Sequence, residues 1–136
     1  MTGKPTCVLD ASALLAYLRN EPGADSVRQA IHRCAAISAV NWAEVLAKLA
    51  DLGEDPDSAA SRLFAEGLAG TAVLIWSFEE GLARESARLR SQTRALGLSL
   101  GDRACLALGR SSRLPILTAD RSWRQIRIGV EIRAIR

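Results

Sequence analysis

The stretch Cys7-Val8-Leu9-Asp10-Ala11-Ser12-Ala13-Leu14-Leu15, residues 7–15, carries the main information about the fold class. An apolar run ends at Asp10, and small and apolar residues follow it without a break. The run predicts a short buried strand over 5–10, and the leucines behind it predict a helix over 11–20. A strand that passes directly into a helix is the repeating unit of α/β folds, so this opening segment indicates that class.

The rest of the 136-residue chain repeats this alternation. Apolar runs rich in branched residues predict further strands over 35–38, 71–76, 115–119 and 130–135. Helical spacing, capping residues and helix-ending Gly and Pro predict helices over 24–33, 39–52, 56–68, 79–96 and 101–110, and a helical turn over 121–125. Strands that alternate with helices indicate an α/β fold, with helices on both faces of a mainly parallel five-stranded sheet. Residues 1–136 have a length that suits a single domain, and no linker interrupts them.

No segment of the sequence is predicted to enter a membrane. The first apolar run is only residues 7–9, which is too short for a signal peptide. No apolar stretch approaches the roughly 20 residues that a membrane-spanning helix needs. Hydrophobic residues make up 49% of the chain, which is enough for a packed core. We therefore expect a folded cytoplasmic protein.

Charge is divided unevenly along the chain, whose formal net charge is +3. Residues 1–83 hold six Lys or Arg and eleven acids, a net charge of −5. Residues 84–136 hold twelve Arg and four acids, a net charge of +8. A basic surface of this kind favours a polyanion partner such as nucleic acid. Arginines such as Arg84, Arg88 and Arg94 also suit a solvated helix face.

Four acidic residues stand at the ends of predicted strands or in the first turns of predicted helices. They are Asp10, Glu44, Asp102 and Asp120. Sites in open α/β sheets form beyond the carboxyl ends of the strands, so we expect these acids to converge there. Carboxylates in apolar surroundings need compensation, and a hard cation such as Mg²⁺ or Mn²⁺ supplies it. The sequence therefore predicts a carboxylate metal site.

Three polar residues close to these acids are predicted to support them. Asn41 precedes Glu44 by three residues, so both side chains would share one face of a helix. Ser12 and Thr118 carry hydroxyls that can hydrogen-bond a carboxylate. Small residues beside the acids, such as Gly101, leave room for a metal ion and a phosphate.

Each acid also has a structural interpretation. Asp10 and Asp120 suit caps of the helical segments that follow them. Asp102 suits a capping box led by Ser99, and Glu44 suits a solvated helix surface. Four separate structural roles would each have to place an acid at the end of a strand or the start of a helix. One shared metal site explains all four positions at once.

The sequence lacks the residues that two other classes of hydrolase need. His32 is the only histidine, whereas histidine-pair ribonucleases and zinc hydrolases need more. Cys7, Cys34 and Cys105 are widely spaced, form no metal-ligand pattern and are expected to be reduced core residues.

The chain resembles PIN-domain nucleases, and in particular the ribonuclease toxins of VapBC-type toxin–antitoxin modules. Four stretches carry the resemblance in order over nearly the whole chain: residues 8–13, 37–45, 97–109 and 115–121. The resemblance implies a PIN-like three-layer α/β/α sandwich and an endoribonuclease that depends on Mg²⁺ or Mn²⁺. It further implies an intact set of catalytic metal ligands, Asp10, Glu44, Asp102 and Asp120, and the supporting residues Ser12, Asn41 and Thr118.

The same resemblance implies partners for the chain. These are an RNA substrate, a cognate VapB-type antitoxin and a second copy of the chain in a homodimer. The antitoxin is expected to fill an apolar groove and to place a basic side chain against the acids. Candidate groove walls, unless they are core, are Leu14, Leu15, Leu18, Val27 and Ile31.

Other functions are compatible with parts of the pattern. A receiver-type phosphoacceptor domain needs a lysine near the late strands, and the only lysines are Lys4 and Lys48. A nucleic-acid-binding module without turnover would not need the complete acid set. A PIN-domain nuclease that cuts other RNA or DNA outside a toxin–antitoxin module also fits, because both polymers share phosphate chemistry. The sequence leaves open whether Trp123 packs in the core or lines the substrate groove.

Overall fold

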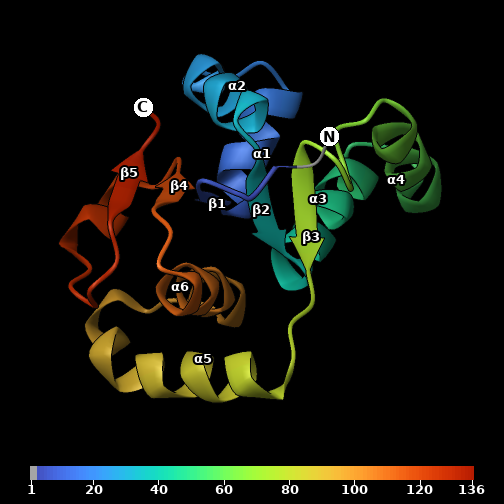
Figure 1. Cartoon of the computed structure of the whole chain (residues 1–136). Helices are drawn as coiled ribbons and strands as arrows, with labels where there is room; N and C mark the ends of the chain where they lie inside the picture. The colour runs from blue at the N-terminus through green and yellow to red at the C-terminus, as the bar shows by residue number, and fades with distance from the viewer. Residues whose placement is uncertain (1–2) are drawn as a thin grey trace.

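The computed structural model describes residues 3–136 and contains a five-stranded sheet (Figure 1). The strands are β1 Val8–Leu9, β2 Ala35–Ser38, β3 Val73–Trp76, β4 Ile116–Thr118 and β5 Ile132–Ala134. They lie in the order β3-β2-β1-β4-β5, and each neighbouring pair is parallel. The predicted α/β fold with a mainly parallel sheet is confirmed, and the sheet is parallel throughout.

Helices contribute to a core on each face of this sheet (Figure 1). One core includes residues of α1 Ala11–Leu18, α2 Ala24–His32, α3 Ala39–Asp51 and α4 Pro56–Ala65. The other includes residues of α5 Glu80–Gln92, the 3₁₀ segment η1 Arg94–Leu96, α6 Leu100–Ser112 and the 3₁₀ segment η2 Arg121–Gln125. Helix α5 packs along α6 at the bottom of Figure 1. The result is a three-layer α/β/α arrangement.

The strand order reverses at β1, which lies at the centre of the sheet. The chain proceeds from β1 outward to β2 and β3, and then returns past β1 to β4 and β5. Val8 pairs with Ala36 on one side and with Ile116 on the other. A crevice forms at such a switch point, beyond the carboxyl ends of the strands. Asp10 directly follows β1 and therefore lies at the position where this fold class places its sites.

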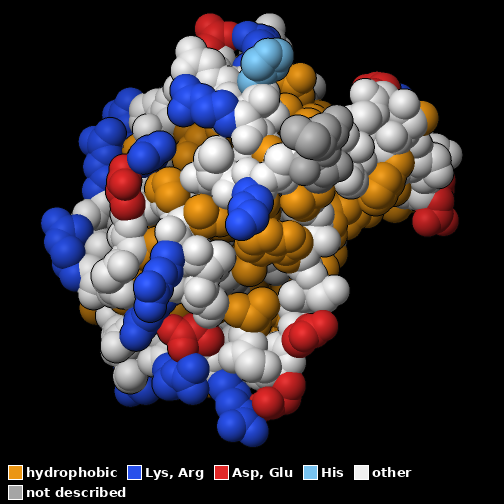
Figure 2. Space-filling view, in the orientation of Figure 1, with side chains coloured by type: hydrophobic (Ala, Val, Ile, Leu, Met, Phe, Trp, Pro, Cys, Tyr) orange, Lys and Arg blue, Asp and Glu red, His pale blue; other side chains and the backbone are white. Residues whose placement is uncertain are grey.

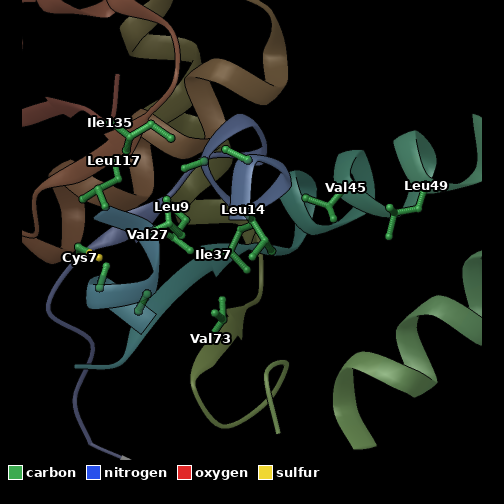
Figure 3. Close-up of a cluster of buried hydrophobic side chains, with 14 of the residues drawn as sticks. Cys7, Leu9, Leu14, Val27, Ile37, Val45, Leu49, Val73, Leu117 and Ile135 are labelled. Carbon is green, nitrogen blue, oxygen red and sulfur yellow. The ribbon is translucent and has the colours of Figure 1, made fainter. Parts of the chain in front are cut away.

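Adjacent residues of β1 point to opposite faces of the sheet and tie the two cores together. Leu9 belongs to the first core, which Figure 3 shows with Leu14 of α1 and Ile37 of β2. Val8 belongs to the second core. Each of these side chains is fully buried, which is worth about 1.5–3 kcal/mol per residue relative to exposure.

The second core also contains Trp123, which is 1% exposed. Of the two interpretations that the sequence left open for Trp123, its burial in this core supports packing. The three cysteines are likewise buried and free, as the sequence predicts.

The predicted helix over 79–96 is interrupted. Helix α5 ends at Gln92, and Thr93 leaves helical geometry with φ −121°. The hydroxyl of Thr93 donates to the carbonyl of Leu89 at 2.7 Å. Threonine hydroxyls offer the backbone an alternative to the helical ladder, and here the chain changes direction into η1.

Candidate active site

Asp10 is held at the junction of β1 and α1. Its Oδ1 accepts a hydrogen bond from the backbone N–H of Ala13 at 2.8 Å and so caps α1. The hydroxyl of Ser12 donates to the same oxygen at 2.7 Å. The hydroxyl of Thr118 donates to Oδ2 at 2.5 Å. The structural role as a helix cap is therefore real, and both predicted supporting hydroxyls also bind this carboxylate.

Thr118 and Ser12 link the end of β4 to the first turn of α1. Thr118 is fully buried, and its hydroxyl oxygen accepts the backbone N–H of Asp120 at 3.0 Å. The hydroxyl oxygen of Ser12 accepts the backbone N–H of Ala119 at 2.9 Å. These bonds hold Asp10 and the Asp120 backbone together although the two acids are far apart in the sequence.

The carboxylate of Asp120 is engaged by the turn that follows it. Its Oδ1 accepts the backbone N–H of Ser122 at 2.9 Å and the Ser122 hydroxyl at 2.6 Å. Asp120 is exposed and caps η2, as its structural interpretation predicts. The structure thus brings its backbone, rather than its carboxylate, into contact with the Thr118 hydroxyl that binds Asp10.

Glu44 is brought to α6 by Asn41. The amide of Asn41 is buried and donates to Glu44 Oε1 at 2.8 Å and to the carbonyl of Gly101 at 2.9 Å. A Cβ at Gly101 would lie 2.7 Å from the carboxyl carbon of Glu44. Glycine therefore allows the carboxylate to lie against the first turn of α6. The contact between Asn41 and Gly101 spans 60 residues, and no local signal in the sequence reveals it.

Asp102 lies in that same first turn. It forms the predicted capping box with Ser99: its backbone N–H donates to the Ser99 hydroxyl at 3.1 Å, and Asp102 Oδ2 accepts the Ser99 N–H at 3.0 Å. One turn further on, burial raises the pKa of the Cys105 thiol well above its ordinary value. Negative charges raise this pKa further, and they come from three acids: Asp10, Asp102 and Glu44. Three of the four predicted acids therefore act on one buried group.

The donor set has the chemistry of a hard-cation site, because carboxylate oxygens are the preferred ligands of Mg²⁺ and Mn²⁺. Over residues 3–136, no three Asp, Glu, His or Cys side chains lie close enough together to enclose a metal ion. Glu44 and Asp120 are exposed, so their side chains can rotate without disturbing the core. Asp10 is 6% exposed. Among residues 3–136, its carboxylate accepts hydrogen bonds only from hydroxyl groups and from the backbone. A divalent cation would offset its buried charge, so the residues fit such an ion.

Burial raises the pKa of Asp10 from an ordinary value of 3.8 to about 6. Hydrogen bonds from Thr118, Ser12 and Ala13 lower this pKa, and the charge of Asp102 raises it. Burial outweighs the three hydrogen bonds. The ionised carboxylate is therefore less stable in the metal-free fold than in the unfolded chain.

This pKa predicts how metal-free stability depends on pH. The folded protein binds the Asp10 proton more tightly than the unfolded chain, so the stabilisation is present below about pH 4 and is lost as pH rises through about 6. The loss is of order 3 kcal/mol, since one pKa unit is worth about 1.4 kcal/mol. We expect Asp10→Asn to gain stability relative to the wild type over this interval. Urea unfolding of both proteins in EDTA at pH 4.5 and 7 measures the difference, and an identical pH dependence in both would contradict the burial argument.

A family model for the PIN domain matches residues 7–129. The chain belongs to the PIN domain family. The family resemblance drawn from the four stretches is thereby confirmed. Membership supports a hydrolase that acts on nucleic acid and a general use of divalent metal ions.

Solved structures share the fold of this PIN domain. A toxin–antitoxin complex from Klebsiella pneumoniae has a TM-score of 0.72 at 20% identity, over 96% of this chain and 98% of that chain. FitAcB from Neisseria gonorrhoeae has a TM-score of 0.71 at 22% identity, over 95% and 97%. DNA-bound VapBC from Salmonella typhimurium has a TM-score of 0.70 at 15% identity, over 98% and 100%. At these identities the likeness establishes the fold. No curated protein shows significant sequence similarity to the chain.

Within residues 3–136, none of the helices of this PIN domain combines the length and hydropathy that crossing a bilayer requires.

Proposed function

We propose that this chain is a single-domain, Mg²⁺- or Mn²⁺-dependent endoribonuclease that acts in the cytoplasm as the toxin of a type II toxin–antitoxin module. The observation that carries the proposal is a buried carboxylate, Asp10, at the switch point of a PIN-domain sheet. Asp10, Glu44 and Asp102 all lie near enough to the buried Cys105 for their charges to raise the pKa of its thiol. Among residues 3–136, none of the four acids forms an ion pair with Lys or Arg. Carboxylates without such partners are available to bind a metal ion, as a metal nuclease needs.

Two groups of residues would have distinct roles in this reaction, as metal ligands and as side chains that orient them. Oxygen ligands would come from the four acids Asp10, Glu44, Asp102 and Asp120. Ser12 and Thr118 orient Asp10, and Asn41 orients Glu44. When bound, a divalent cation supplies a Lewis acid that activates water and offsets charge on the scissile phosphate.

The buried thiol of Cys105 does not suit a covalent mechanism. Burial, and after it the negative charges of Asp10, Asp102 and Glu44, raise the pKa of this thiol well above its ordinary value and keep it protonated. Attack by water on the phosphodiester would leave a 5′-phosphate and a 3′-hydroxyl.

The antitoxin would occupy a groove between α1, α2 and α4. This groove has a volume of about 610 Å³, and its apolar walls include Leu18, Ile31, Leu63 and Leu68. Two of the candidate wall residues from the sequence are thus at the groove. Two others, Leu14 and Val27, are fully buried core residues, which is the alternative that the sequence left open for them. Leu15 is half-buried against the first core.

We include a homodimer in the proposal. Exposed leucine and phenylalanine side chains at Leu52 and Phe64 of the α3–α4 region supply apolar surface for contacts between chains. A second copy of the chain that packs on these side chains would remove their apolar surface from water.

A cleavage assay tests the enzymatic part. Purified protein is incubated with total RNA in Mg²⁺, in Mn²⁺ and in EDTA, and the new 5′ ends are sequenced. We expect cleavage with either cation, none in EDTA, and 5′-phosphate ends. Cutting of single-stranded DNA at an equal rate would favour the alternative of a PIN nuclease with another nucleic-acid substrate. Binding of RNA without turnover in any cation would favour a non-catalytic binding module.

Co-expression tests the toxin part. Induction of the chain alone is expected to arrest growth, and simultaneous expression of the adjacent small open reading frame is expected to restore it and to co-purify. Normal growth together with cation-dependent cleavage in vitro would leave a nuclease and remove the toxin role.

A further inference from the structure

A basic pocket lies where the end of α5, η1 and the start of α6 meet. It has a volume of about 180 Å³ and is lined by Arg90, Thr93, Arg94, Gly97, Leu98 and Arg103. Half of these residues carry a guanidinium group, and none is acidic. Helix α5 ends just before Thr93, and the chain then turns into η1, so that residues on both sides of this turn line the pocket. We call it the arginine pocket.

The arginine pocket differs from its surroundings in having no counter-charges. Neighbouring arginines are neutralised by carboxylates, Arg84 by Glu80 and both Arg88 and Arg110 by Glu85. In the described chain, Arg90, Arg94 and Arg103 take part in none of the ion pairs. Unneutralised arginines around a concavity favour an anion inside it. Figure 2 shows that Lys and Arg side chains also gather over the β5 and α5 side of the molecule.

In the part of the chain that the structure describes, Arg103 is the one arginine of the pocket whose side chain is fixed by a hydrogen bond. Its Nη1 donates to the carbonyl of Ser86 at 3.2 Å, which anchors the guanidinium against α5. Its Nε is buried and has no hydrogen-bond partner among residues 3–136. A buried N–H without an acceptor is costly. Arg103 also lies in the first turn of α6, where the helix dipole disfavours a cation. The bond to Ser86 holds the Arg103 guanidinium at the wall of the pocket, and this guanidinium has no carboxylate partner within the described chain.

The arginine pocket lies on the other side of α6 from Glu44. Gly101 faces Glu44, and Arg103 follows it by two residues, a step of about 200° around a helix. The two faces of this turn are separated by roughly one helix diameter, about 10 Å. A strand with one phosphate at the acids could therefore reach the pocket with a phosphate a short distance along.

We propose that the arginine pocket binds a backbone phosphate of the RNA strand next to the scissile one and so positions the substrate. The inference rests on the proposed ribonuclease function. The pocket is smaller than the roughly 300–1,000 Å³ of typical small-molecule sites, so it suits a single phosphate group rather than a whole nucleotide. Guanidinium groups bind phosphate oxygens in a bidentate manner, which gives position as well as affinity.

Two double variants with equal loss of charge test this subsite. Arg90→Gln with Arg94→Gln empties the pocket of two guanidinium groups. Arg33→Gln with Arg113→Gln is the control: both residues are exposed and also lack ion pairs in the described chain. Arg113 lies at the opposite end of α6, roughly 20 Å from its start. Binding of labelled single-stranded RNA is measured in EDTA over a range of salt, and cleavage kinetics in Mg²⁺.

We expect the pocket variant to bind RNA at least about tenfold more weakly and the control less than about threefold. The slope of log K against log salt should fall by about 0.7 for each phosphate that the variant no longer neutralises. KM should rise while kcat stays within about twofold, because the pocket does not touch the reacting phosphate. Equal weakening in both variants would mean that charge acts only at long range and would overturn the subsite. Competition by polyglutamate stronger than by unlabelled RNA would assign the pocket to an acidic protein segment and would also overturn it.

The results separate this inference from the proposed function. Pocket-dependent RNA binding by a wild-type chain that never cleaves would contradict the nuclease and leave the subsite intact. Normal cleavage with RNA binding that ignores the pocket would contradict the subsite alone.

Discussion

The Asp10→Asn variant is expected to remain folded and to lose at least about a hundredfold in kcat/KM for RNA cleavage. Asparagine keeps the size of the side chain and an oxygen that can accept the N–H of Ala13. It removes the charge that a divalent cation needs at the switch point of the sheet. Loss of cation binding costs several kcal/mol of transition-state stabilisation, and each tenfold in rate corresponds to about 1.4 kcal/mol.

Cleavage in Mg²⁺ and in Mn²⁺, together with thermal unfolding in EDTA, measures both effects of this change. Asp51→Asn is the matched control, because it removes the same charge from an exposed position at the end of α3. We expect full activity in the control. Near-wild-type turnover by folded Asp10→Asn would refute the assignment of the metal site, whatever the fate of the toxin role.

The Gly101→Ala variant is expected to lose at least about tenfold in activity without losing stability. An added Cβ would lie 2.7 Å from the carboxyl carbon of Glu44 and would push that carboxylate away from α6. Because Glu44 is exposed and its side chain is flexible, it can move at little cost to the fold. Alanine favours helix over glycine by about 0.5–1 kcal/mol, so the melting temperature should stay the same or rise.

Gly81→Ala provides a close control for Gly101→Ala. Both glycines are the second residue of their helix, α5 and α6, and a Cβ at Gly81 would meet nothing within 4 Å. Equal activities for the two variants would show that the Glu44 carboxylate does not need its place beside Gly101. A large loss of stability in Gly101→Ala would instead mean that the backbone of α6 cannot tolerate the side chain.

The sequence predicts the fold class well because the alternation of apolar runs and helical spacing survives in local stretches. The second strand and the turn over 121–125 coincide with β2 and η2. Strand lengths were predicted less well: the run over 5–10 yields only Val8–Leu9 as paired residues. Hydrogen-bond pairing depends on neighbouring strands from distant parts of the chain, and apolar composition alone does not report it.

Some features of the site are predicted from short motifs, and others depend on contacts between residues far apart in the sequence. The acids and their caps follow from local motifs, and the bonds from Ser12 and Thr118 to Asp10 agree with their predicted supporting roles. The engagement of Asp120 by Ser122 is also local, yet it competes with the expected convergence. The contact of Asn41 with Gly101 and the arginine pocket depend on how α3 and α5 meet α6. Such contacts arise only from tertiary packing.

The hydrogen bond between Thr118 and Asp10 can form only late in synthesis of the chain on the ribosome. The two residues are separated by 108 positions in the chain. At translation rates of roughly 5–20 residues per second, Thr118 is added about 5 to 20 seconds after Asp10. During that interval β1 has no β4 beside it, and Asp10 lacks its most distant partner. The constellation of acids is therefore one of the last features that the nascent chain completes, and an incomplete translation product that stops before β4 cannot assemble it.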